Sequence, residues 1–315
     1  MGRRGAWRDL GPVTVGGVEL VTPFMTASGT SGHDTELAPH MDLTGIGAVV
    51  VKSLHHGPWE GNPAPRVHTA GAGMVNAVGL EGPGVDAWVR DSLPRLEAAG
   101  VTTVVSIWGR GVDEYVRAAE LLAPHAARFA AVEINLSCPN LEGRNSIFAH
   151  SAEMSRDVVS GVVGAVGVPV WAKLSANTDR LVEVAAAVSG AGASAVTLVN
   201  TMLGMQIDTS SGRFTLGNGG GGLSGPPIHA IAVRAVHDVA AALPGLDIVG
   251  VGGISSGRDA VEMMMAGAGC VQIGTASFAR PDSVVRVRDQ AAAILAGRNC
   301  RSWADVTGLV HRAAG

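Results

Sequence analysis

Aromatic residues make up only 4% of this chain of 315 residues, and cysteine occurs three times. The widely spaced cysteines form no disulfide framework and no CxxC metal pattern, which suits a reducing, cytoplasmic environment. No apolar run follows Arg3 and Arg4, so we expect no signal peptide. No apolar stretch reaches the roughly 18 residues of a membrane span. The net charge of -4 argues against nucleic acid or an anionic membrane as a partner.

Apolar residues and glycine are plentiful, at 47% of the chain and 44 residues respectively. Together with the few aromatics, they suit tight turns and alanine-rich helices packed on a sheet. Residues 13–20, with Gly16 and Gly17 at the turn, predict a small hairpin. Eight apolar runs follow, and most are separated by stretches with helical spacing. The predicted strands are residues 23–27, 48–52, 102–107, 130–135, 169–173, 195–199, 247–251 and 270–273, and the helices include 113–122, 151–163, 179–188, 226–242 and 258–266.

This alternation predicts an α/β fold, a (β/α)8 TIM barrel with an N-terminal β-hairpin and a C-terminal helical extension. We expect residues 1–315 to form a single barrel domain. A doubly wound open sheet is the alternative. The barrel is favoured because no G-x-G-x-x-G follows the first strand and glycine-rich turns follow the last two. The long connections 53–86 and 200–225 are expected to form the upper rim.

Glycines mark the ends of the last two predicted strands, as Gly252-Gly253 and Gly274-Thr275. In barrels, these two loops commonly bind a phosphate, because glycine lets backbone N–H groups approach the phosphate oxygens. Glycines can also simply close tight turns. Their occurrence in both loops predicts a phosphate site, which either a phosphorylated substrate or flavin mononucleotide (FMN) would satisfy.

A thiol follows the fourth predicted strand, where Cys138 is succeeded by Pro139. Proline stops the strand, so the thiol lies on a loop at the end where barrels place their chemistry. Free cysteines are often buried apolar residues, but the polar neighbours of Cys138 favour a catalytic role. Lys52 and Lys173 end strands 2 and 5, and are expected to anchor an anionic ligand or a reduced flavin.

Four asparagines lie at or beside strand ends or in rim loops. A single asparagine often only forms a turn. Four on one rim are better interpreted as contacts to a ring with alternating amide N–H and C=O groups. They are Asn76, Asn135, Asn140 and Asn200.

The remaining cysteines and the histidines give weaker signals. Cys270 is expected in the core, and Cys300 receives no function. The ten histidines show no H-x-x-H spacing. His55-His56 is interpreted as a solvated loop pair, and no metal site is predicted.

From about residue 22 to 281, the chain resembles dihydroorotate dehydrogenase. It is most similar to the class 1 soluble enzymes and, among these, to the class 1B catalytic subunit. The resemblance rests on residues 61–66 (GNPAPR), 74–80 (MVNAVGL), 135–140 (NLSCPN), 200–201 (NT) and 222–226 (GLSGP), together with Gly252-Gly253 and Gly274-Thr275.

The resemblance implies that Cys138 is the catalytic base of class 1. The implied FMN contacts are Ser28, Lys52, Ser53, Asn135, Lys173, Val199, Gly225, Gly252, Gly253, Gly274 and Thr275. The implied orotate pocket is Lys52, Asn76, Ala77, Val78, Gly79, Leu80, Asn135, Asn140, Asn200 and Thr201.

The implied reaction is oxidation of (S)-dihydroorotate to orotate in de novo pyrimidine biosynthesis. Cys138 takes a proton from C5, and a hydride passes from C6 to N5 of FMN. Class 1B enzymes pass the electrons to a separate subunit with FAD and a 2Fe–2S cluster, which reduces NAD. This chain has no four-cysteine pattern for such a cluster. The short loop 141–148 is less like class 1A, which uses fumarate. The family also suggests a homodimeric core.

Three departures leave room for a paralogue acting on another cyclic amide. Ser106 replaces a usual asparagine, Ala176 replaces a common proline, and residues 211–220 are atypical. One rival is a dihydropyrimidine dehydrogenase-like enzyme, but there histidine typically follows the Cys-Pro pair, whereas Asn140 does so here. The other is an FMN-binding barrel without activity.

Overall fold

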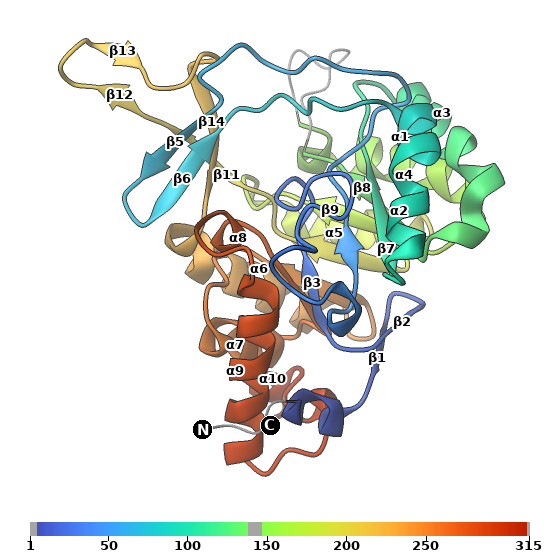
Figure 1. Cartoon of the computed structure of the whole chain (residues 1–315), viewed down its shortest axis with the longest axis vertical. Coiled ribbons are helices and arrows are strands. Elements are labelled where there is room, and N and C mark those ends of the chain that lie inside the picture. The colour runs from blue at the N-terminus through green and yellow to red at the C-terminus, as the bar shows by residue number, and fades with distance from the viewer. Residues whose placement is uncertain (1–4, 138–146, 314–315) are drawn as a thin grey trace.

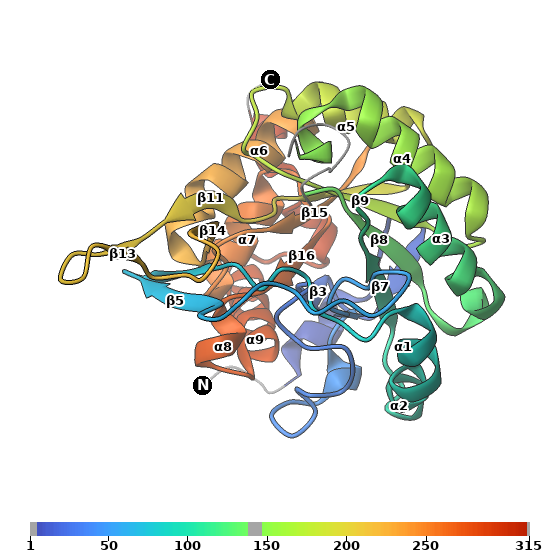
Figure 2. The same cartoon turned by 90° about the horizontal axis from the view of Figure 1, so that it is seen from above.

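A parallel eight-stranded barrel forms the centre of the computed structural model, which describes residues 5–137 and 147–313 (Figures 1 and 2). The strands follow one another around the barrel in chain order, and the helices lie outside them. All eight lie where the apolar runs predicted them, so the (β/α)8 barrel is confirmed. They are β3 (Phe24–Thr26), β4 (Val49–Val50), β7 (Thr103–Ile107), β8 (Ala131–Asn135), β9 (Val170–Leu174), β10 (Ala195–Leu198), β15 (Asp247–Val251) and β16 (Cys270–Ile273).

The barrel closes between its first and second strands, β3 and β4, through few hydrogen bonds. Thr26 donates its backbone N–H to the carbonyl of Ala48 at 3.2 Å. Its hydroxyl oxygen accepts the backbone N–H of Val50 at 2.8 Å. A side chain thus takes the place of a backbone carbonyl at this seam, which we call the β3–β4 seam.

The helices pack apolar faces against the outside of the barrel. Tyr115, Ala118 and Leu122 of α3 are fully buried, as their helical spacing requires. Ser256 and Asp259 form a capping box that starts α7. The predicted helices are confirmed, as α3 (Val112–Leu122), α4 (Ala152–Ala165), α5 (Leu181–Gly190), α6 (His229–Ala242) and α7 (Gly257–Met265); the others are α1 (Val85–Asp91), α2 (Leu93–Ala98), α8 (Ala276–Ala279), α9 (Ser283–Gly297) and α10 (Leu309–Ala313).

Short 3-10 helices add to these elements. The last 3-10 helix, η6 (Trp303–Asp305), forms the predicted C-terminal helical extension together with α10. None of the helices within residues 5–137 and 147–313 combines the length and apolar character of a membrane span. The 3-10 helices are η1 (Ala6–Leu10), η2 (Leu43–Gly45), η3 (Ala123–Arg128), η4 (Phe148–His150), η5 (Pro226–Ile228) and η6 (Trp303–Asp305).

The predicted hairpin, β1 (Val13–Val15) with β2 (Val18–Leu20), covers the N-terminal end of the barrel. Trp171 donates its indole N–H to the carbonyl of Gly16 at 3.0 Å, and the Gly16 N–H reaches Asp247 at 2.7 Å. Leu20 is fully buried here beside Cys270, which is a core residue as predicted.

A four-stranded antiparallel sheet stands on the opposite end of the barrel, and the sequence did not predict it. It is assembled from the two long connections that were expected at the rim. A small hairpin, β12 (Ile207–Asp208) with β13 (Arg213–Phe214), projects beyond it (Figure 1). The sheet runs in the order β11 (Met202–Met205), β14 (Gly220–Ser224), β6 (Gly73–Asn76) and β5 (Val67–Ala70).

Candidate active site

A cavity of about 1250 Å³ lies between the carboxyl ends of the barrel strands and the antiparallel sheet. Every described residue of the predicted cofactor and substrate sets lines it. Cys138 and Asn140 lie outside the described residues, but Ser137, next to Cys138, also lines the cavity. The lining includes Ser28, Lys52, Ser53, Asn76, Ala77, Val78, Gly79, Leu80, Asn135, Lys173, Val199, Asn200, Thr201, Gly225, Gly252, Gly253, Gly274 and Thr275.

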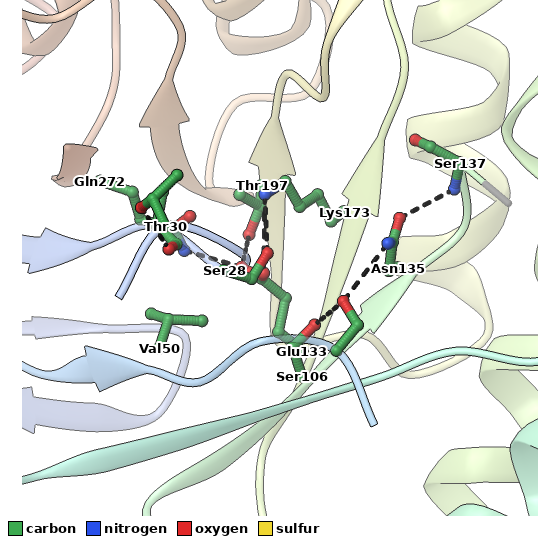
Figure 3. A network of polar contacts seen from close by, with 12 residues as sticks. Ser28, Thr30, Val50, Ser106, Glu133, Asn135, Ser137, Lys173, Thr197 and Gln272 are labelled. Atoms are coloured by element: carbon green, nitrogen blue, oxygen red, sulfur yellow. Dashed lines mark hydrogen bonds and ion pairs between the residues drawn. The ribbon is translucent and has the colours of Figure 1, made fainter. Parts of the chain in front are cut away.

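Asn135 is held in place at the end of β8. Its side-chain N–H donates to the Ser53 hydroxyl at 3.3 Å, and its side-chain oxygen accepts the N–H of Ser137 at 3.2 Å (Figure 3). Ser53 in turn shares a 2.8 Å hydrogen bond with Ser106. Ser106, where the family usually has asparagine, is fully buried. It therefore supports Asn135 through Ser53 rather than lining the cavity itself.

Two buried or half-buried lysines face the cavity. The Lys173 ammonium donates to the Ser28 hydroxyl at 3.0 Å and lies 3.9 Å from a carboxylate oxygen of Glu133. Burial lowers the pKa of Lys173, and Glu133 opposes that shift. Burial also lowers the pKa of Lys52, against an opposing effect of Glu81. Both ammonium groups are therefore short of water and favour a negative ligand.

The glycine loops after β15 and β16 form one wall. Gly252 and Gly253 have φ values of 137° and 69°, which favour glycine. A Cβ on Gly253 would lie 2.6 Å from the Cβ of His229. No larger side chain fits, so the backbone itself faces the cavity. Arg280 and Arg286 also line the cavity. Neither carries a recognisable signal in the sequence, because both follow the last barrel strand, Arg280 directly after α8 and Arg286 within α9.

The antiparallel sheet forms the opposite side of the cavity. Asn76 donates its amide to the carbonyl of Gly222 at 3.2 Å, which ties β6 to β14. Two further lining residues were missed. Asn62 donates to the Ala77 carbonyl at 3.1 Å, and Asn177 donates to the Thr201 carbonyl at 3.1 Å. Asn62 belongs to segment 61–66, which carries part of the family resemblance, whereas nothing in the sequence distinguishes Asn177 from an ordinary loop asparagine.

The interpretation of His55-His56 as a solvated pair is wrong for His55, which is 5% exposed. Its Nε2 lies 3.2 Å from Glu114 and its Nδ1 lies 3.1 Å from the Gly57 carbonyl. The partner is 59 residues away, so the pairing was invisible in the sequence. His55, His56 and Glu114 have ligand atoms within 4.8 Å of one another. The Arg110 guanidinium already binds both Glu114 oxygens, so we assign no metal.

The residues around the cavity fit a flavin nucleotide. Glycine loops can approach a phosphate, and lysines can offset the negative charge that the flavin ring gains on reduction. The side-chain oxygen of Gln272 is buried and has no hydrogen-bond partner in the described part of the chain. Gln272 also lines the cavity. A buried acceptor without a partner is costly, and a ring N–H of a ligand would satisfy it.

Comparison with known proteins identifies the family. The family model described as "Dihydroorotate dehydrogenase" matches residues 12–295. Similar proteins named "Dihydroorotate dehydrogenase B (NAD(+)), catalytic subunit" occur in Desulforudis audaxviator (43% identity; 96% of this chain and 98% of the relative), Geobacter sp. strain M21 (40%; 95% and 97%) and Bacillus pumilus (37%; 96% and 99%). The chain therefore belongs to the dihydroorotate dehydrogenase family of flavin-dependent oxidoreductases, and it is most similar to the class 1B catalytic subunits.

Proposed function

We propose that this chain oxidises (S)-dihydroorotate to orotate in de novo pyrimidine biosynthesis and that its flavin is FMN. One observation carries the proposal: the described residues of the predicted FMN and orotate sets, drawn from many parts of the barrel, line a single cavity in a member of this family. The volume of about 1250 Å³ exceeds that of many ligand sites. It leaves room for a flavin and a small ring together.

Each group has a role in this reaction. Cys138 removes the C5 proton as a thiolate, and FMN, when bound, would supply the acceptor for the hydride from C6. Asn76, Asn135 and Asn200 bind the amide groups of the substrate ring. Lys173 offsets the charge of the reduced cofactor, and the glycine loops hold the phosphate.

Replacement of the base tests its role. Cys138→Ala should still bind orotate, while flavin reduction by dihydroorotate slows about 10²–10⁴-fold. A free thiol has a pKa of about 8.5, so single-turnover reduction should accelerate as pH rises towards that value. Stopped-flow absorbance measures both effects, and a flat pH profile would contradict the assignment.

The activity itself is tested by adding substrates anaerobically to the purified flavoprotein. Bleaching of the flavin by dihydroorotate is the expected result. Bleaching by dihydrouracil alone would instead indicate a dihydropyrimidine dehydrogenase-like enzyme. A flavin that reacts with neither would indicate a binding protein.

We also propose that the electrons leave through a separate subunit with FAD and a 2Fe–2S cluster, which reduces NAD. The relatives' names, "catalytic subunit" and "NAD(+)", support this. Affinity purification from the native cell should recover an iron–sulfur flavoprotein, and light scattering should give a homodimeric core. NAD reduction by the isolated chain alone would contradict the need for that subunit.

A further inference from the structure

The carboxylate of Glu133 lies inside the barrel on β8 and is fully buried. One of its oxygens accepts the Thr197 hydroxyl at 2.9 Å and the Gln272 amide N–H at 2.7 Å (Figure 3). Both donors are neutral and come from other barrel strands, β10 and β16. A carboxylate removed from water at this depth needs a cation nearby to remain ionised.

Lys173 supplies that cation. The second oxygen of Glu133 has no hydrogen-bond partner among the described residues, and it lies 3.9 Å from the Lys173 ammonium. The side chain of Lys173 is 4% exposed. Lys173 lines the cavity but Glu133 does not. The carboxylate is therefore placed behind the lysine, where it can act on a ligand only through other side chains.

Gln272 is the second side chain through which Glu133 can act. A carboxylate only accepts hydrogen bonds, so the NH2 of Gln272 must face Glu133. This leaves the Gln272 carbonyl oxygen for the cavity that the residue lines, and that oxygen has no other partner in the described chain. One buried carboxylate thus orients both a cation and an acceptor.

We propose that Glu133 is a positioning residue that keeps Lys173 protonated at the flavin site in both redox states and turns the side-chain carbonyl of Gln272 towards the cavity. The inference rests on the proposed function, because it concerns the flavin site. The ammonium then needs no proton from solvent when the cofactor gains electrons.

The other groups near Glu133 do not replace this pairing. Thr197 and Gln272 do not titrate in the accessible range. The Cys270 thiol on β16 has its pKa raised by burial, with Asp247 and Glu133 adding to the effect, so it stays neutral. Lys52 interacts with Glu81 and Arg66 instead.

The first test uses the flavin-free full chain. In Glu133→Gln, the buried Lys173 ammonium loses its counter-charge, so the urea concentration at the midpoint of unfolding should fall. This midpoint should fall further as pH is lowered from about 10. Adding Lys173→Met should recover most of that loss. Equal losses in the single and double variants at every pH would overturn the proposal. Glu133→Asp, which keeps the charge, should retain the wild-type pH dependence and provides a second variant if Glu133→Gln does not fold.

The second test measures the flavin's reduction potential against pH. In Glu133→Gln, Lys173 should take up a proton as the flavin is reduced, which makes the dependence steeper at neutral pH. Thr197→Val removes a hydrogen bond from the same carboxylate but leaves its charge, so it should keep the wild-type slope. The same slope in all three proteins would overturn the proposal. A chain that bound no flavin would refute the proposed function, while the first test still decides the Glu133–Lys173 coupling.

Discussion

Gly253 is a residue of the cavity wall that leaves no room for a larger side chain. Its φ of 69° is strained for alanine, and an added Cβ would lie 2.9 Å from the Gly225 carbonyl oxygen. Gly253→Ala should lower flavin affinity at least about tenfold, or about 1.4 kcal/mol, and should also lower stability. Gly164→Ala is the control, since no atom lies within 4 Å of its added Cβ. Calorimetric titration with FMN compares them; equal affinities would contradict this role.

Glu114 should contribute to stability only above acidic pH. Burial raises its pKa, but the hydrogen bonds from Arg110 and His55 outweigh burial and bring the pKa down to about 2. The ionised form is therefore favoured in the folded state, and its contribution is present above the ordinary value of 4.5 and lost as pH falls towards 2. Glu114→Gln should cost about 1 kcal/mol at pH 7.

Urea unfolding across pH 2–7 measures this effect. The difference between wild type and Glu114→Gln should shrink as the solution is acidified. The exposed pair of Glu183 with Arg180 offers a control, because Glu183→Gln should change stability little at any pH. A constant difference down to pH 2 would exclude the ionised carboxylate as its source.

Among single residues, the sequence predicted the site residues that lie at or beside strand ends. It did not predict those whose positions depend on contacts with residues far away in the sequence. Asn135 is the last residue of β8 and Lys173 is the last but one of β9, so their place on the rim followed from the apolar runs. The burial of His55 depends on Glu114, which lies on another element. Arg286 reaches the cavity only because α9 packs beside the loop after β15, where it donates to the Ser255 carbonyl at 3.1 Å.

Among the elements, β14 determines the shape of the cavity's upper side. A Cβ on Gly221 would lie 2.2 Å from the Asn76 carbonyl oxygen, so alanine there must push β14 away from β6. Because Asn76 belongs to the proposed orotate pocket, Gly221→Ala should weaken orotate binding at least about tenfold. FMN binding should change little.

The neighbouring glycine provides a matched control. A Cβ on Gly220 would be 3.6 Å from its nearest atom, so Gly220→Ala should leave orotate affinity unchanged. Fluorescence titration with orotate and with FMN separates the effects. A parallel loss of both ligands in Gly221→Ala would mean that the sheet supports the whole cavity rather than the substrate side.

The sequence could not reveal this sheet for a physical reason. Three consecutive glycines begin β14, and glycine is a poor strand former that reads as a loop. Here the missing side chain is required at Gly221 and Gly222, where an added Cβ would lie 2.2 Å from the Asn76 carbonyl oxygen and 2.0 Å from the Thr201 hydroxyl oxygen. The barrel strands were predictable because burial on both faces makes them continuously apolar.

At the scale of the whole molecule, the N-terminal end of the barrel is expected to contribute to stability, whereas the cavity lies at the C-terminal end. Leu20 is fully buried under the N-terminal end. Leu20→Ala should lower the free energy of unfolding by about 2–5 kcal/mol while flavin affinity stays the same. Glu19→Ala, at the exposed neighbouring position, is the control. Urea unfolding and FMN titration test this, and a parallel loss of affinity would show that the two ends are coupled.

The overall architecture was the most predictable level, because eight apolar runs with helical connections allow few arrangements. How the barrel closes was not predictable. The β3–β4 seam depends on the Thr26 hydroxyl receiving the Val50 N–H, a contact between residues 24 positions apart. Nothing in the local pattern distinguishes that threonine from one that faces solvent.

The β3–β4 seam has a consequence for how a ligand affects the protein. Ser28 follows β3 and Lys52 follows β4, and both line the cavity. A ligand that contacts both residues therefore connects the first and second strands of the barrel where their own hydrogen bonding is sparse. A ligand stabilises the state that binds it. Binding would therefore stabilise the closed barrel at the seam where few hydrogen bonds join β3 to β4. The empty protein should exchange its amide hydrogens fastest along this line, and saturation should slow that exchange selectively.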